Sequence, residues 1–301
     1  MARLLFGVGA IGRPIELLQA ALLGAGYDPK GTDGHFGQDT RKAVERWQKG
    51  AGAAKSGAIS DTEWRQLTGE PVPSVEERCL ALTAAIEGHG YTIAQGNWDD
   101  AWLTWGIVGF TLKSGSLQAV VDEVQRTAKR RIDEAFGADA ATFLEVLASP
   151  RARQKSWATS ISAGSRVVEP WRTHFERFGS FPEVQAAQRA VARRNYFEPA
   201  VDTAHRLGLV SELGLALCFD IHVQNGGVKR TSMTALRPAV EAGDERRLRL
   251  ALAEQAALTA NPTYAADVRA RKRTLATGQG TVHGRVLELA NWGLDEFPFG
   301  Q

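Results

Sequence analysis

Apolar residues recur three or four positions apart along most of this chain, which is the period of an amphipathic helix. Before residue 50 two runs show this spacing, one built on Ile15, Leu18 and Leu22 and one on Ala43, Val44 and Trp47. Beyond residue 75 the pattern predicts helices near residues 75–88, 115–135, 139–148, 151–163, 182–194, 198–207, 211–224, 233–240, 243–257 and 262–277. A mainly α fold is therefore expected.

Helix-start signals and a break in the pattern divide the chain. Thr40 is placed to cap the second run, and Ser60 with Glu63 three residues later forms a capping box for a third short helix. Two prolines, a glycine and a serine fall within residues 68–74, which indicates a linker. We expect one domain over residues 1–71 and a second over residues 76–301.

One segment of the second domain does not follow the helical pattern. Residues 88–112 contain five glycines among β-branched and aromatic residues, which is typical of turns and short irregular strands. We predict a loop or short hairpin here. A polar, glycine-rich loop on a helical body is also where we expect a cleft.

Composition and charge exclude several classes of protein. The chain has 301 residues, 44% of them hydrophobic, and a formal net charge of +2, so nothing indicates nucleic-acid binding. No apolar stretch is long enough for membrane insertion, and the first residues lack the full pattern of a signal peptide. Cys79 and Cys218 lie in apolar helix-like stretches and are expected to be buried thiols. We expect a monomer.

Candidate chemistry gathers around the glycine-rich segment. Glu87 follows an apolar helix, and its neighbours favour the protonated form of a carboxyl group, which a general acid needs. Asp99 and Asp100 follow on the same segment; adjacent aspartates repel, so one is expected to be protonated or turned outward. Thr104 offers a hydroxyl that can orient water. A carboxylic acid facing a carboxylate is the pair that hydrolyses glycosidic bonds, although by spacing alone these residues fit surface and turn roles as well.

Aromatic and buried polar residues complete the set. Trp98, Trp102 and Trp105 are candidates for stacking on sugar rings, with at least one expected in the core. Asp220 lies on an apolar helix and needs a basic partner, for which the candidates are Arg269, Arg271 and Arg273. The six histidines, His89 and His222 among them, show no metal-binding spacing, so we expect no metal and no cofactor.

The first domain resembles the type 1 peptidoglycan-binding domain. The resemblance rests on Leu17-Leu-Gln19, Leu22, Gly26-Tyr27, Asp33-Gly34, Phe36-Gly37, Thr40, Ala43-Val44 and Trp47-Gln48. It implies a three-helix fold that binds peptidoglycan. The loop that carries Asp33, His35 and Phe36 is the expected wall-binding loop, with its ligand contacts coming from polar atoms and Phe36 plugging the helix pair.

The second domain resembles family 46 chitosanases, members of the lysozyme-like superfamily. The motifs are Glu87, Gly90-Tyr-Thr92, Asp99, Thr104-Trp-Gly-Ile-Val-Gly-Phe110, Arg193-Arg-Asn-Tyr-Phe-Glu-Pro-Ala-Val201 and Cys218-Phe-Asp-Ile-His-Val223. The resemblance implies a two-lobed α+β fold with a cleft between the lobes and hydrolysis with inversion. It assigns Glu87 as acid, Asp99 as base and Thr104 as the residue that holds the water, and it places Tyr91 beside the substrate.

The second domain also departs from that family. Its loop between Glu87 and Asp99 is shorter, which indicates a cleft shaped for another sugar. Chitosan is polycationic, and its hydrolases line their clefts with acidic residues, whereas this loop offers only Asp99 and Asp100.

Three functions remain open from the sequence. The first is a muramidase, either a phage endolysin or a secreted effector, which acts on peptidoglycan glycan strands and reaches the wall without a signal peptide. The second is a chitosanase with an anchoring domain. The third is a wall-binding protein without activity.

Overall fold

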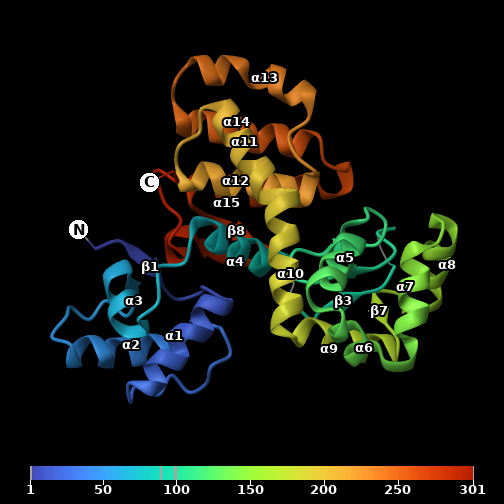
Figure 1. Ribbon diagram of the computed structural model, residues 1–301. Coiled ribbons are helices and arrows are strands. Elements are labelled where there is room, and N and C mark those ends of the chain that lie inside the picture. Colours follow the sequence, from blue (N-terminus) through green and yellow to red (C-terminus); the bar gives the residue numbers. More distant parts are fainter. Residues whose placement is uncertain (1, 89, 98–99, 301) are drawn as a thin grey trace. The chain divides into compact units, whose positions relative to one another are not determined.

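The computed structural model describes residues 2–88, 90–97 and 100–300, and it is mainly helical, as the sequence predicts (Figure 1). Contacts divide the chain into two compact units. Unit 1 contains residues 1–86 and 196–301, and unit 2 contains residues 87–195. Within the described ranges, no helix has the length and apolar character needed to cross a membrane.

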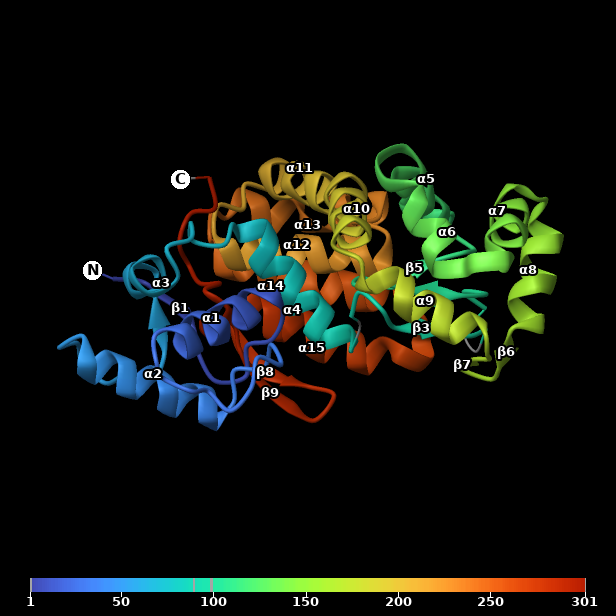
Figure 2. The same ribbon diagram turned by 60° about the horizontal axis from the view of Figure 1, so that its bottom comes forward.

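Unit 1 consists of helices and two small ladders, coloured blue to teal and gold to red in Figure 1. Its elements are β1 (Leu4–Phe6), α1 (Arg13–Gly24), α2 (Gln38–Gly50), β2 (Ile59–Ser60), α3 (Asp61–Thr68), α4 (Val75–Glu87, whose last residue belongs to unit 2), α11 (Glu198–Leu207), α12 (Glu212–Asn225), α13 (Arg230–Glu241), α14 (Glu245–Leu258), α15 (Ala265–Thr277), β8 (Gln279–Val282) and β9 (Arg285–Glu288). β8 and β9 form the hairpin that follows α15 in Figure 2.

The N-terminal helices α1, α2 and α3 surround a small core that includes Leu18, Val44 and Trp64. The capping box predicted for α3 is confirmed, because the Glu63 amide donates to Ser60 Oγ and the Glu63 carboxylate accepts from the Ser60 amide. The predicted cap of α2 is wrong. The helix begins at Gln38, and Thr40 is buried within its first turn.

The predicted linker is a packed connection. The Trp64 indole donates to the Pro71 carbonyl at 2.9 Å, and Arg78 Nε donates to the Pro73 carbonyl at 3.1 Å. Ser74 and Glu77 form a second capping box, which starts α4. Residues on both sides of position 72 belong to unit 1. A domain boundary near residue 72 therefore stays a prediction.

One buried carboxylate holds distant parts of unit 1 together. Glu212 at the start of α12 is 2% exposed and pairs with Arg78 of α4 at 2.8 Å. Arg3 near β1 binds the same carboxylate, and both arginines donate to the Gly293 carbonyl. Removing any one charge would leave the others buried without full compensation.

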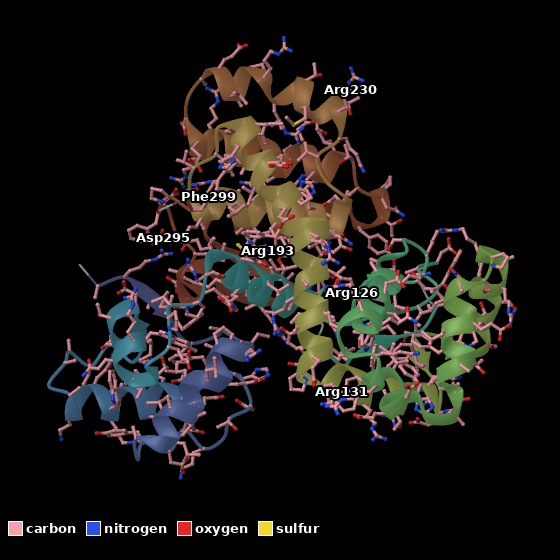
Figure 3. The ribbon with its side chains drawn as sticks, in the orientation of Figure 1. Arg126, Arg131, Arg193, Arg230, Asp295 and Phe299 are labelled. Carbon is pink, nitrogen blue, oxygen red and sulfur yellow. The ribbon has the colours of Figure 1, made fainter. Side chains whose placement is uncertain are left out.

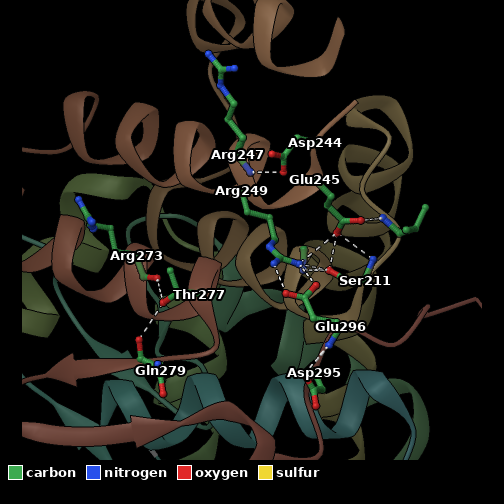
Figure 4. Close-up of polar contacts among 12 residues, drawn as sticks. Ser211, Asp244, Glu245, Arg247, Arg249, Arg273, Thr277, Gln279, Asp295 and Glu296 are labelled. Atoms are coloured by element: carbon green, nitrogen blue, oxygen red, sulfur yellow. Dashed lines mark hydrogen bonds and ion pairs between the residues drawn. The ribbon is translucent and has the colours of Figure 1, made fainter. Parts of the chain in front are cut away.

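Arg249 of α14 organises a second polar cluster, shown in Figure 4. Its guanidinium is 1% exposed and lies 2.5 Å from the carboxylate of Glu296 and 3.6 Å from that of Glu245. It also donates to Ser211 Oγ at 2.6 Å, and the Ser211 side chain caps α12. The cluster therefore fixes the start of α12 against α14 and the C-terminal segment.

Asp220 lies in the buried centre of α12 and has two basic partners on α15. Its carboxylate is 2.5 Å from Arg271 Nη2 and 2.5 Å from Lys272 Nζ. Burial alone would raise the pKa of Asp220, but the two cations and their hydrogen bonds outweigh it and hold that pKa below its usual value. Arg271 was predicted as a partner. The other two candidates are wrong: Arg269 pairs with Glu254, and Arg273 is exposed. Lys272 is the second partner.

Unit 2, coloured green to yellow in Figure 1, combines short helices with a five-stranded antiparallel sheet in the order β5-β4-β3-β7-β6. Its elements are β3 (Ala94–Gln95), β4 (Thr104–Trp105), β5 (Phe110–Thr111), α5 (Ser116–Ala128), α6 (Arg130–Phe136), α7 (Ala140–Ala148), α8 (Arg151–Ser160), β6 (Ser162–Ala163), β7 (Arg166–Val167), α9 (Trp171–Ser180) and α10 (Pro182–Ala192). The short irregular strands predicted within residues 88–112 are confirmed.

Two features of unit 2 differ from the prediction. The helix predicted over residues 115–135 is broken at Lys129 into α5 and α6, and α9 was not predicted. Arg131 of α6, labelled in Figure 3, pairs with Glu183 at 2.8 Å and lies over the Phe181 ring. This contact ties α6 to the start of α10.

Asp220→Asn should destabilise the protein by about 3–5 kcal/mol, because it removes the buried carboxylate that pairs with Arg271 and Lys272. Urea unfolding measures the loss, and Asp202→Asn, at an exposed position on α11, serves as the control. The pKa of Asp220 is lowered from 3.8, so its contribution is complete above that pH and is lost as the pH falls through the lower native value. An Asp220→Asn protein as stable as the control would contradict this role.

Candidate active site

The sheet of unit 2 has one polar face. Thr104 of β4 lies directly opposite Thr111 of β5 and Gln95 of β3, and Gln95 lies opposite Arg166 of β7. Residues directly opposite each other share a face of the sheet. Thr111, Thr104, Gln95 and Arg166 therefore form one row across four strands, which we call the polar row. Thr104 is 8% exposed, Thr111 and Gln95 are half-buried, and Arg166 is exposed.

Trp105 points to the other face and belongs to the core. It is fully buried, its indole N–H donates to the Phe175 carbonyl at 3.2 Å, and its ring stacks on Phe178 with centroids 5.2 Å apart. Successive residues of a strand face opposite sides, so Trp105 cannot share a face with Thr104. The prediction that Trp105 stacks on a sugar is therefore wrong, and Trp105 is the core tryptophan that was expected.

The loop that carries the candidate aspartates is tied down at both ends. The Gly96 amide donates to the Ser165 carbonyl at 2.9 Å, and the Asn97 amide donates to Ser162 Oγ at 3.1 Å. The Trp102 amide closes the loop by donating to Asn97 Oδ1 at 3.2 Å. A side chain at Gly96 would come within 2.7 Å of Ser162 Oγ, so glycine permits this close approach. Trp98 and Asp99 lie outside the described residues.

Asp100 is held between two lysines. Its side chain is 57% exposed, with Lys113 Nζ at 2.6 Å and Lys155 Nζ at 3.3 Å. The hydrogen bonds from Lys113 and Lys155 keep the pKa of Asp100 below its usual value. One aspartate of the pair was expected to be protonated or turned outward. Asp100 is turned outward, and its lowered pKa favours the ionised form.

Trp102 also departs from its predicted role. It is 6% exposed, and the Arg151 guanidinium lies 5.0 Å from the centre of its ring. Its backbone has a φ of 69°, which is rare for a bulky residue and requires support from neighbours. The assignment of Trp102 to sugar stacking is corrected, because burial and Arg151 leave no free ring face for a sugar.

Glu87 and Tyr91 lie at the entry to the glycine-rich segment. Glu87 is the half-buried last residue of α4, after a run of buried residues, and Gly88 with a φ of 66° ends the helix there. Tyr91 is half-buried; its hydroxyl accepts from Arg189 at 3.2 Å. Both side chains keep partial access to solvent, as a substrate-binding role requires.

Gln188 of α10 supports this segment and was not predicted from the sequence. It is fully buried, accepts from the Ile107 amide at 2.9 Å and donates to the Tyr91 carbonyl at 2.9 Å. A Cβ atom at Gly106 would come within 2.4 Å of Gln188 Oε1, so the turn after β4 needs glycine. One amide side chain thereby fixes the backbone just before β3 and just after β4.

The predicted wall-binding loop lies in unit 1 and is organised by Gln19. Gln19 Nε2 donates to Asp33 Oδ1 at 2.9 Å, and this bond, with a second from the His35 amide, lowers the pKa of Asp33. Asp33 and His35 are exposed. Phe36 is 1% exposed, so it fills the core as expected and offers no ligand contact, which corrects its inclusion among binding residues.

In the part of the chain that the structure describes, no group of three or more His, Cys, Asp or Glu side chains could hold a metal ion. The polar row and the tied loop instead offer hydroxyl, amide and carboxylate groups. Such groups can position water and exchange protons.

Two family models match the sequence. The model described as a putative peptidoglycan binding domain matches residues 12–67, and the model described as glycosyl hydrolase family 46 matches residues 84–261. Both resemblances noted in the sequence are therefore confirmed. No curated protein sequence matches the chain.

Two solved structures have a similar fold. The native chitosanase from Bacillus subtilis MY002 gives a TM-score of 0.50 at 20% identity, over 71% of this chain and 95% of that chain. A mutant chitosanase from the same organism, complexed with 6 GlcN, gives a TM-score of 0.51 with the same identity and coverage. At this identity the likeness concerns the fold.

Gln188→Ala should cost about 1–3 kcal/mol, because it leaves the buried amide of Ile107 and the carbonyl of Tyr91 without a partner. It should also lower catalytic activity by loosening the segment around Thr104. Urea unfolding and turnover are both measured. Gln185→Ala, which removes a half-buried amide from the same helix, is the matched control. Equal losses in the two variants would argue against the support described for Gln188.

Proposed function

This chain belongs to glycosyl hydrolase family 46, and we propose that it hydrolyses the β-1,4 glycosidic bonds of peptidoglycan, between muramic acid and glucosamine. In this proposal Glu87 is the general acid, Asp99 is the general base and Thr104 holds the attacking water. Family membership supports a glycosidase, and the choice of polymer is the further step.

The peptidoglycan-binding domain carries that choice. Residues 12–67 match a module for this polymer, and they are built into the same compact unit as the C-terminal helices. A wall-binding domain raises the local concentration of cell-wall glycan around the rest of the chain. We therefore propose that this protein acts at the bacterial cell wall.

The mechanism needs an acid and a base on opposite sides of the scissile bond. Glu87 donates a proton to the glycosidic oxygen as its bond to the anomeric carbon breaks. Asp99 removes a proton from a water molecule that attacks the same carbon from the other side, which inverts its configuration. The water is held by the Thr104 hydroxyl on the polar row, beside Gln95. Solvent then returns both carboxyl groups to their starting states.

Hydrolysis of chitosan is the second candidate, because the similar solved structures are chitosanases by name. In that case the N-terminal domain would only anchor the enzyme. The two candidates share the same residues and the same bond type, so they differ in substrate alone.

Purified peptidoglycan and chitosan, each digested and analysed for new reducing ends by mass spectrometry, separate the candidates. We expect muramic acid at the new ends from peptidoglycan. Glu87→Gln should lower the rate by about a hundredfold or more, as loss of a general acid does, while Glu241→Gln, at an exposed position on α13, should not. Release from chitosan alone would overturn the proposal, and so would full activity of the Glu87→Gln enzyme.

The two aspartates should respond differently to substitution. Asp99→Asn should lower kcat by about a hundredfold or more, because it removes the base. Asp100→Asn should lower kcat less than about fivefold, because Lys113 and Lys155 already hold that carboxylate as a weak base. Steady-state kinetics on peptidoglycan measures kcat for both variants. A larger loss in Asp100→Asn than in Asp99→Asn would assign the role of general base to Asp100.

A further inference from the structure

Three basic side chains gather beside Asp100, and the proposed mechanism uses none of them. Lys113 and Lys155 pair with the Asp100 carboxylate at 2.6 Å and 3.3 Å. Arg151 reaches the same place, because its Nη2 donates to the Lys113 carbonyl and its guanidinium lies over the Trp102 ring. We call Lys113, Arg151 and Lys155 the basic cluster.

Helix geometry places two of these residues together. Arg151 and Lys155 are four residues apart on α8, so they lie on the same side of the helix. Arg153, between them in sequence, pairs instead with Glu145 of α7 at 2.8 Å. Among the described residues, Asp100 is the acidic residue that pairs with the basic cluster. Within residues 100–300, one carboxylate therefore pairs with a cluster of three cations, and the described side chains carry an excess of positive charge.

The excess extends towards the polar row. Residues 151–168 contain four basic residues and no acidic one. One of the four is Arg166, which is exposed and lies two strands from Thr104 on the same face of the sheet. Positive charge therefore lies near the candidate catalytic segment at two places, the basic cluster beside Asp100 and Arg166 on β7.

This charge distinguishes two classes of glycan. The amino groups of chitosan are cationic and would be repelled here, whereas the lactyl-peptide substituents of peptidoglycan carry carboxylates. We infer that the basic cluster is a binding subsite for carboxylate groups on the glycan next to the scissile bond, an inference that rests on the proposed function. Ammonium and guanidinium groups bind carboxylates through charge-assisted hydrogen bonds. Asp100 keeps the two lysines together until the substrate carboxylate joins them.

The test combines enzyme variants that differ in the charge of the basic cluster with substrates that differ in charge. The enzymes are the wild type, Lys113→Gln/Lys155→Gln, the charge-preserving Lys113→Arg/Lys155→Arg, and Arg153→Gln as a control on the same helix. The substrates are purified peptidoglycan, the same peptidoglycan with its carboxylates converted to amides, and chitosan. Release of reducing ends gives kcat and KM, and co-sedimentation reports binding by the N-terminal domain separately.

On native peptidoglycan the double glutamine variant should lose roughly tenfold in kcat/KM, mainly through KM, since each exposed ion pair contributes a few-fold. The double arginine variant should keep most of the activity. On amidated peptidoglycan the tenfold difference should shrink several-fold, and added salt should shrink it on the native substrate.

Three results would overturn the subsite, and they show whether the proposed function fails with it. Wild-type activity on peptidoglycan that is insensitive to amidation, or a glutamine variant equally impaired on both forms, removes the subsite and leaves the proposed function intact. Wild-type release of reducing ends from chitosan and none from peptidoglycan removes the proposed function and the subsite together.

Discussion

The alternation of side chains along β4 is the constraint on which the candidate site depends. Trp105 is fixed in the core by a hydrogen bond to the Phe175 carbonyl and by its stack on Phe178. Because neighbouring strand residues face opposite sides, Thr104 must then lie on the polar face. The antiparallel register of β3 and β7 adds Gln95 and Arg166 to that face. The buried Trp105 thereby determines on which face of the sheet the Thr104 hydroxyl lies.

Buried charge has a corresponding role in unit 1. Glu212 pairs with Arg78 of α4 and with Arg3, so the helix that ends in Glu87 and the first residues of the chain depend on one carboxylate. Such pairs contribute less to net stability than to a defined arrangement, since their desolvation is costly. In the proposed function this arrangement joins the wall-binding module to the helix that carries the acid.

Much of the fold could be predicted from the sequence, because helical spacing and capping residues are local signals. The capping box at Ser60 and the irregular strands after Gly88 are examples. The missed helix α9 carries the same kind of signal, since Trp171, Phe175 and Phe178 are buried at helical spacing. The pairing of β3 with β7 joins Gln95 to Arg166, which are too far apart in the sequence for any short window to contain both.

In the candidate site, too, some features follow from local sequence signals and others depend on contacts between distant segments. If Thr104 and Trp105 are neighbours in a strand and Thr104 faces the site, Trp105 must face the core. The alternation of strand side chains could therefore have corrected the assignment of Trp105 to sugar stacking. Lys272 as a partner of Asp220 was missed because it lies next to Arg271, and adjacent helix positions usually diverge. Gln188 and the basic cluster join segments far apart in the sequence, so no local pattern could reveal them.

In the proposed mechanism the attacking water lies on the polar row, on the opposite side of the sugar from Glu87. The most direct measurement is a ¹H NMR time course of a soluble glycan fragment during cleavage, which identifies the anomer formed first. The proposed mechanism predicts the α-anomer, the product of inversion at a β-linkage. Initial formation of the β-anomer would contradict it, because retention requires a covalent intermediate and a carboxylate in the place assigned here to water.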